Sequence, residues 1–315
     1  MFLLAQYFLL FGWQNQFSHA MIHTLDLHFL DVPQAIAAYL VETSAGPVLI
    51  ESGPYSTYEH LKEEIQRVGF SSEDIRHVLL THIHFDHAGA AWAWAEQGAT
   101  VYVHPVGVPH LADPAKLWNS AQRIYQDDMD RLWGEMRPIP EAQLQPVNHE
   151  EILTFGNTRI TAYHTPGHAV HHIAYQLDDV IFTGDVGGVR INQGLVEPPC
   201  PPPDINVEDW QQSIALLRER APSALYLTHF GRVEEVDAHL DRLSKQLINW
   251  ADWVRESMEG DRPAEVIVPE FTAYVKNQLV AHGAGEKVVE QYEAANPSWM
   301  SVAGLMRYWK KKEHK

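Results

Sequence analysis

Residues 81–87, Thr-His-Ile-His-Phe-Asp-His, constrain this chain more than any other stretch, because four of their side chains are of metal-binding type. The apolar run at residues 78–80 predicts a buried strand, and the alanine- and tryptophan-rich residues 88–95 predict a helix. The cluster is therefore expected on a strand-to-helix turn at one edge of a sheet.

The four side chains divide into two pairs. In an extended segment, residues two apart point the same way, so His82 and His84 can bind one cation together. Asp86 and His87 follow the bend of the chain and face another direction. A core or surface role explains one histidine near an apolar strand, but a motif match of four ligand types at this spacing favours a functional site. The turn can thus serve two adjacent metal ions, with a pair of ligands for each.

Three further ligand-type residues follow predicted strand ends. His168 lies on a Pro-Gly turn, Asp185 comes just after a short apolar strand, and His229 ends another. Loops at strand exits can gather around one point, so these three side chains are candidates for the same site.

The complete pattern is His-x-His-x-Asp-His, followed at long range by single His, Asp and His residues at strand ends. It resembles the metallo-β-lactamase superfamily, and the version here is similar to the glyoxalase II and RNase Z-like hydrolases of that superfamily. The resemblance covers residues 21–240 and implies an α/β fold, the four-layer αββα metallo-β-lactamase sandwich, here with a helical insertion and a helical C-terminal extension.

The chain is expected to divide into three parts. Residues 1–20 are predicted to be an extension or a weak export signal, since residues 2–13 are apolar but too short to span a bilayer, and no Lys or Arg precedes them. Residues 21–242 form the expected catalytic domain, with a charged, tryptophan-bearing helical insertion at 113–136. Residues 243–315 are predicted to be a helical C-terminal extension.

The resemblance also assigns roles to the ligand-type residues. It implies two divalent metal ions, with Zn²⁺ favoured and iron or manganese as alternatives. The implied metal ligands are His82, His84 and His168 at the first ion, Asp86, His87 and His229 at the second, and Asp185 as the bridge between them. Asp86 and Asp185 are the carboxylates expected to be catalytic, and a hydroxide shared by the two ions is the expected nucleophile.

Other reactive side chains are expected outside the ligand set. His171 and His172 are predicted to lie beside the ligands as hydrogen-bonding groups, or at the surface, because all seven ligand positions are filled. Arg190 is expected either to meet an anionic substrate group or to be a plain surface residue. Cys200 has no visible histidine partner that would make it a nucleophile.

Two segments are candidates for the walls of a pocket. Trp118, Tyr125 and Trp133 recur every seven or eight residues in the insertion, so they are predicted to share one helical face. That face either packs on the body of the domain or covers the site as a lid. The proline-rich loop at 198–203 is stiff because proline fixes φ. It is expected either to be a rigid connector before the predicted helix at 207–218 or, since it begins a dozen residues after Asp185, to form a wall of the pocket.

The excess of acidic residues disfavours some classes of substrate. The chain has 41 acidic and 23 basic residues, a net charge of −18, which disfavours nucleic acid and polyanionic substrates. We therefore expect hydrolysis of small carboxylic esters, thioesters or lactones, with a phosphodiesterase of the same fold as the alternative. A persulfide dioxygenase with a single iron is less favoured, because Asp185 is followed by Val-Gly-Gly-Val and not by the Gly-Arg-Thr-Asp-like stretch of those enzymes.

The expected partner is a small-molecule substrate. No nucleic-acid partner and no membrane span are expected, and a homo-oligomer is left open. The single cysteine fits a reducing compartment, so we expect a cytoplasmic protein, with export through the weak N-terminal signal as the minor alternative.

Overall fold

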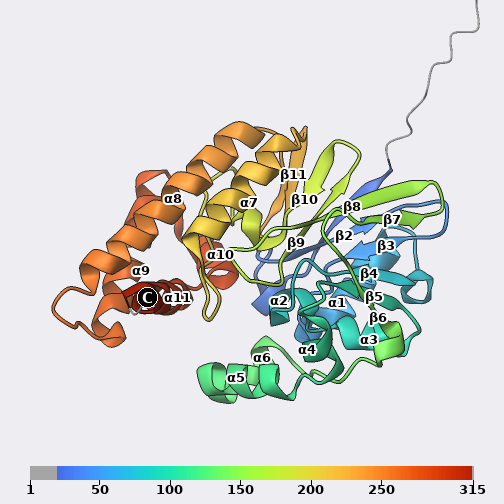
Figure 1. The fold of residues 1–315 in the computed structure, drawn as a ribbon, viewed down its shortest axis with the longest axis horizontal. Helices are drawn as coiled ribbons and strands as arrows, with labels where there is room; N and C mark the ends of the chain where they lie inside the picture. The colour runs from blue at the N-terminus through green and yellow to red at the C-terminus, as the bar shows by residue number, and fades with distance from the viewer. Residues whose placement is uncertain (1–19, 314–315) are drawn as a thin grey trace, which may run out of the picture.

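Two six-stranded sheets form the centre of the molecule (Figure 1). The computed structural model describes residues 20–313. The first sheet consists, in spatial order, of β1 (Ile22–Asp26), β2 (Ala37–Val41), β3 (Val48–Ile50), β4 (His77–Leu79), β5 (Thr100–Val103) and β6 (Leu144–Pro146). The second consists of β12 (Gly231–Val233), β11 (Ala224–Leu227), β10 (Val180–Phe182), β9 (Ile173–Leu177), β8 (Thr158–His164) and β7 (Ile152–Phe155). The first sheet opens on an antiparallel meander, since β1 pairs with β2 and β2 with β3 in antiparallel register.

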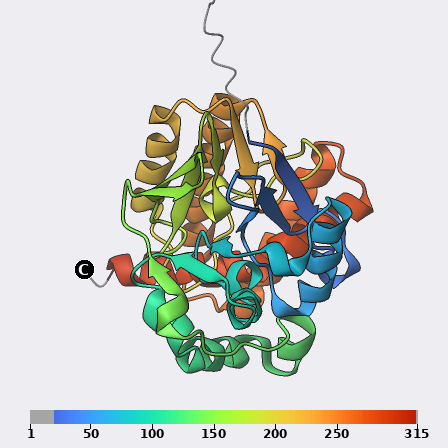
Figure 2. The same cartoon turned by 90° about the vertical axis from the view of Figure 1, so that its right-hand side faces the viewer.

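Helices cover the sheets from outside (Figures 1 and 2). The first half of the chain contributes α1 (Tyr58–Arg67), α2 (Phe85–Ala88), α3 (Ala91–Glu96), α4 (Val108–Ala112), α5 (Ala115–Tyr125) and α6 (Met129–Leu132). The second half contributes α7 (Val207–Glu219), α8 (Val236–Ser257), α9 (Ala264–Ala281), α10 (Glu286–Ala295) and α11 (Ser298–Glu313). Among residues 20–313, no helix combines the length and apolarity that crossing a bilayer requires.

Strand β2 shows why the chain folds in layers. All five of its residues are buried. Tyr39 belongs to the core between the two sheets, whereas its neighbour Leu40 belongs to the core beneath the helices, because successive side chains of a strand point to opposite faces. A strand that is buried on both faces reads as a continuous apolar run. The sheets therefore lie inside and the helices outside, which confirms the predicted αββα sandwich.

The strand directions bring the candidate ligands to one edge of the second sheet. Strand β9 is antiparallel to both β8 and β10, and β10 is parallel to β11. Consequently β8, β10 and β11 run the same way and end on the same side. His168 and His229 lie in the loops that follow β8 and β11, and Asp185 lies in the short 3-10 helix Gly184–Gly187 that follows β10. Strand ends of this kind are a common location for ligand sites in α/β sheets.

The predicted insertion at 113–136 contains short helices and not one long helix. Helix α5 ends at Tyr125, Gln126 adopts a positive φ of 49°, and a 3-10 turn leads into α6. The positive φ stops the helix, because a residue with a side chain is strained there. Among the C-terminal helices, α8 is continuous through residues 242 and 243, the predicted boundary between the catalytic domain and the extension. The predicted N-terminal extension lies outside the described residues, except for Ala20.

Candidate metal centre

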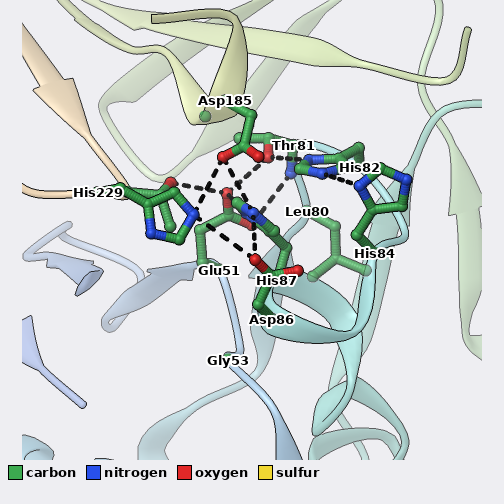
Figure 3. Close-up of polar contacts among 12 residues, drawn as sticks. Glu51, Gly53, Leu80, Thr81, His82, His84, Asp86, His87, Asp185 and His229 are labelled. Carbon is green, nitrogen blue, oxygen red and sulfur yellow. Dashed lines mark hydrogen bonds and ion pairs between the residues drawn. The ribbon is translucent and has the colours of Figure 1, made fainter. Parts of the chain in front are cut away.

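All seven predicted ligands converge into two clusters beneath the sheet edge. The first cluster contains His82, His84 and His168, and the second contains Asp86, His87, Asp185 and His229. Within each cluster the candidate ligand atoms lie within 4.8 Å of one another. Figure 3 shows Asp185 above the two groups, with His82 and His84 on one side and His229 on the other.

His84 is at the centre of the first cluster. Its Nδ1 atom lies 3.0 Å from Nε2 of His82 and 3.0 Å from Nε2 of His168. The backbone of His84 is still extended, with φ −65° and ψ 154°, just before α2 begins at Phe85. Burial lowers the pKa of His82 and His168, and burial together with His168 lowers the pKa of His84 to about 3. The three imidazoles are therefore neutral, which is the form that binds metal ions.

Asp185 joins the two clusters through its two carboxylate oxygens. Oδ2 lies 3.3 Å from Nε2 of His168 in the first cluster. Oδ1 lies 3.1 Å from Nε2 of His87 and 3.3 Å from Nε2 of His229 in the second. Asp86 completes the second cluster, with Oδ2 at 3.5 Å from His87 Nε2 and 3.6 Å from His229 Nε2. One side chain is thus positioned to contact ions on both sides.

The charges of the second cluster compensate one another. Burial alone would raise the pKa of Asp185, but His87, His168 and His229 outweigh it and hold that pKa well below its usual range. Burial alone would lower the pKa of His229, but Asp185 and Asp86 raise it to about 9. The acids are therefore ionised, as metal coordination requires.

Three atoms at the centre of the second cluster indicate that a cation fits there. Nε2 of His87, Nε2 of His229 and Oδ1 of Asp185 are buried, and within residues 20–313 they contact one another and Asp86 as ion pairs without hydrogen-bond geometry. Buried polar atoms that form no hydrogen bond are costly, and native proteins rarely leave them so. A divalent ion among them would satisfy all three at once. Imidazole nitrogens and carboxylate oxygens are ligands that zinc and similar ions prefer, so the cluster is able to bind metal ions.

Glu51, which was not among the predicted site residues, orients a ligand of the second cluster. It is fully buried just after β3, and its carboxylate lies 2.8 Å from Nδ1 of His87. It also accepts hydrogen bonds from the backbone N–H and the hydroxyl of Thr81 and from the hydroxyl of Thr228. Binding Nδ1 in this way directs Nε2 of His87 toward the cluster. The signal in the sequence was an acidic residue directly after an apolar strand.

Backbone carbonyls orient two more ligands. Nδ1 of His168 donates to the carbonyl oxygen of Pro199 at 2.8 Å, and Nδ1 of His229 donates to that of Ala35 at 2.7 Å. In both residues the remaining nitrogen, Nε2, faces the cluster. The tautomer and the ring orientation are therefore set before any ion binds.

A cavity of about 820 Å³ opens onto His84, Asp86 and Asp185. Its walls come from the insertion, from the proline-rich loop and from the junction of α10 and α11. Tyr125 and Trp133 of the insertion line it. Trp133 also stacks on Phe29 and Phe85, so the aromatic face both packs on the body and walls the site. Trp118 does not line the cavity.

The remaining side chains considered in the sequence, Arg190, Cys200, His171 and His172, are all buried. Arg190 is buried, with its guanidinium 3.4 Å from Glu235 and its backbone N–H donating to the carbonyl of His229. The expected surface position of Arg190 is wrong, because the residue is buried. Arg190 is not part of the cavity wall, and its backbone N–H holds the loop that carries His229. Cys200 is fully buried. His172 is buried and hydrogen-bonded, whereas His171 lines the cavity.

Comparison with known proteins agrees with the fold. The family model of the metallo-β-lactamase superfamily matches residues 32–229. The metallo-β-lactamase fold-containing protein ST1585 of Sulfurisphaera tokodaii is 26% identical over 234 residues, which are 72% of this chain and 86% of that protein. Atrochrysone carboxyl ACP thioesterase of Aspergillus fumigatus is 23% identical over 264 residues, 83% of this chain but 51% of the thioesterase. The chain therefore spans about half the length of that fungal relative.

Solved structures show the same fold. The metallo-β-lactamase family protein TTHA1429 of Thermus thermophilus superposes with a TM-score of 0.69 at 17% identity, over 93% of this chain and 94% of that one. The structure of ST1585 superposes with a TM-score of 0.66 at 20% identity, over 90% and 98%. Since the family model covers more than half of the sequence and all seven ligand-type residues of the pattern converge in the structure, the chain belongs to the metallo-β-lactamase superfamily of metal-binding hydrolases.

Proposed function

We propose that this chain is a dinuclear metal-dependent hydrolase of small carboxylic esters, thioesters or lactones. The observation that carries the proposal is the position of Asp185, which lines the cavity and lies between the two clusters. Its two oxygens face different clusters, 3.3 Å from His168 on one side and 3.1 Å from His87 on the other. A carboxylate placed in this way supports two ions side by side.

Each ion would be held by residues of one cluster. His82, His84 and His168 would hold the first, and Asp86, His87 and His229 the second, with Asp185 shared. Two such ions, most simply Zn²⁺, supply Lewis acidity and a water-derived nucleophile near neutral pH. The protein fixes the orientation of the ligands, because Nδ1 of His87, His168 and His229 is already hydrogen-bonded to Glu51 or to a backbone carbonyl.

The apolar walls of the cavity favour a substrate that is recognised through an apolar acyl group. Tyr125, Trp133 and Trp299 contribute aromatic surface, and the prolines of the 198–203 loop contribute rigid apolar surface. A volume of about 820 Å³ lies within the range of small-molecule sites. Such walls would orient the acyl group and exclude water around the bond to be cleaved.

The charges around the cavity favour a carboxylic ester over a phosphodiester. The wall has two basic side chains, Lys116 and Arg131, and Arg131 is paired with Asp128 at 3.0 Å. Asp204 and Glu293 add further acidic charge. With a net charge of −18 over the whole chain, the site does not concentrate anionic substrates.

The relationship to the Aspergillus thioesterase supports thioesters within this class. A thioester carries the same electrophilic carbonyl as an ester, so the arrangement of clusters and apolar wall serves both.

Kinetics on matched substrates test the proposal. The metal-loaded protein is assayed with an aryl carboxylic ester, an aryl thioester and an aryl phosphodiester, and the ester and the phosphodiester have the same leaving group. We expect the highest kcat/KM on the carboxylic substrates and loss of turnover after chelation. A phosphodiester preference of about tenfold, or about 1.4 kcal/mol in barrier, would establish the phosphodiesterase alternative instead.

Metal analysis tests the ligand assignment separately. Wild-type protein should carry close to two ions per chain, one in each cluster. His84→Ala and His229→Ala should lose metal mainly from opposite sites, and Asp185→Ala should weaken both. Normal metal content in Asp185→Ala would exclude the bridge.

A further inference from the structure

His171 lies in the cavity beside the first cluster but outside the ligand set. Its side chain lines the cavity, and the residue is only 7% exposed. The centroid of its ring is 5.8 Å from that of His84 and 6.1 Å from that of His82. His171 belongs to neither group of convergent ligand atoms, so metal binding does not explain its position.

Neither ring nitrogen of His171 has a hydrogen-bond partner among residues 20–313. Nδ1 is buried and unpaired. Nε2 is unpaired but not fully buried, so Nε2 is the nitrogen that reaches the cavity surface. The neighbouring His172 differs, since its Nδ1 contacts the hydroxyl of Thr165 at 2.8 Å and its Nε2 accepts from the N–H of Val186. A polar ring kept unpaired in a cavity wall next to a reactive centre indicates a partner that arrives with the substrate.

The tautomer of His171 determines what it can offer. A proton on Nδ1 would bury an N–H group without an acceptor, which is unfavourable. The alternative tautomer carries the proton on Nε2 and points an N–H donor into the cavity. A doubly protonated ring would present the same donor, so the direction of the hydrogen bond does not depend on the charge of the ring.

We infer that His171 donates a hydrogen bond from Nε2 to the carbonyl oxygen of the bound ester, thioester or lactone. The inference rests on the proposed function for the identity of the substrate. Negative charge develops on that oxygen when the carbonyl carbon is attacked, so a fixed donor there stabilises the transition state more than the ground state. His171 is then a catalytic residue that touches substrate, and the product carboxylate would keep the same contact.

The experiment compares three variants of the full-length, metal-loaded protein. His171→Leu removes the donor, and His171→Gln places an amide N–H at a similar distance from the backbone. His104→Asn is the matched control, because His104 is also buried but does not line the cavity, and asparagine can keep its acceptor for the N–H of Val106. Each variant is measured for metal content, for kcat and KM on an aryl ester, and for phenylacetate affinity by calorimetry.

We expect His171→Leu to lower kcat about 100-fold with a smaller change in KM, as for loss of one donor to a developing oxyanion. Its phenylacetate Kd should rise about tenfold, the effect of one lost hydrogen bond. His171→Gln should recover most of both losses, and His104→Asn should behave like wild type. Metal content should be equal in all four proteins.

Three results would overturn the inference: a His171→Leu variant with unchanged kcat and phenylacetate affinity, a loss of metal in that variant, or no binding of phenylacetate by wild type. The proposed function fails separately, if wild-type protein binds phenylacetate through His171 but hydrolyses no carboxylic substrate. If wild type and His171→Leu hydrolyse esters equally well, the proposed function stands and the role of His171 is excluded.

Discussion

His168 donates a hydrogen bond from Nδ1 to the carbonyl oxygen of Pro199 at 2.8 Å, and this contact connects the first cluster to the C-terminal helices. Pro199 belongs to the loop at 198–203, which packs on α11. Arg307 and Lys311 of α11 donate to the carbonyl of Pro203 at 3.3 and 2.8 Å. The C-terminal helices therefore support the position of a candidate ligand, although they contribute no ligand themselves.

Gly304→Ala should disturb this connection. A Cβ atom at Gly304 would lie 1.9 Å from the carbonyl oxygen of Cys200, so α11 and the loop would have to separate. We expect destabilisation of about 1–3 kcal/mol, typical of overpacking, and a loss of metal affinity of about 10- to 100-fold, mainly at the first cluster. Chemical denaturation and zinc competition measure the two effects.

Gly285→Ala is the control for that prediction. Gly285 has no neighbour within 4 Å of an added Cβ and a negative φ of −79°. It should change stability by less than about 1 kcal/mol and leave metal affinity unaltered. Equal effects of the two substitutions would show that the contact between α11 and the loop does not support the site.

Glu51→Gln should weaken metal binding without touching an ion directly. The carboxylate loses its charge-assisted contact with Nδ1 of His87 at 2.8 Å, while the amide can still accept one bond from Thr81. We expect a decrease in metal affinity of about 10- to 100-fold, measured by competition with a chromogenic chelator. Glu42→Gln removes a comparable contact with His23 outside the site, and it should bind metal like wild type.

Glu197 should make the stability of the protein depend on pH. The residue is 2% exposed, and burial, with a contribution from Glu293, raises its pKa from 4.5 to about 8. Because the folded pKa is the higher one, the folded state binds the proton more tightly than the unfolded state does. The resulting stability is fully present below pH 4.5 and is lost as pH rises through 8, at up to about 1.4 kcal/mol per pH unit.

Glu197→Gln tests that dependence, because the amide keeps the shape and cannot ionise. The free energy of unfolding of the variant, relative to wild type, should increase steadily between pH 5 and pH 8. Urea denaturation at four pH values measures it. A difference that stays constant over this interval would mean that Glu197 does not titrate in the folded protein within it.

Ile124→Glu should reduce the preference for large acyl groups. Ile124 lies on α5, is 38% exposed and lines the cavity. A charge in this wall should lower kcat/KM for phenylbutyrate esters about tenfold more than for acetate esters, since a change in apolar pocket contact is worth about 1–3 kcal/mol. Ile248 on α8 is 45% exposed and does not line the cavity, so Ile248→Glu should alter neither value. Identical effects of the two variants would exclude a role of α5 in binding the acyl group.

The sequence, through its resemblance to a known family, predicted the fold class and all seven residues that converge in the centre. The spacing of His82 and His84 was sufficient to pair them, because the alternation of side chains along an extended backbone is a local property. Asp185 and His229 could be found because each follows an apolar strand, and strand ends of the same direction meet at one edge.

Only the tertiary structure decided what surrounds the ligands. Glu51 meets Thr228, 177 residues away, and His229 meets the carbonyl of Ala35, 194 residues away. The donor of His171 faces a cavity whose walls come from the insertion, the proline-rich loop and the α10–α11 junction. Such contacts follow from how the layers pack and carry no periodicity along the chain, so a local pattern cannot predict them.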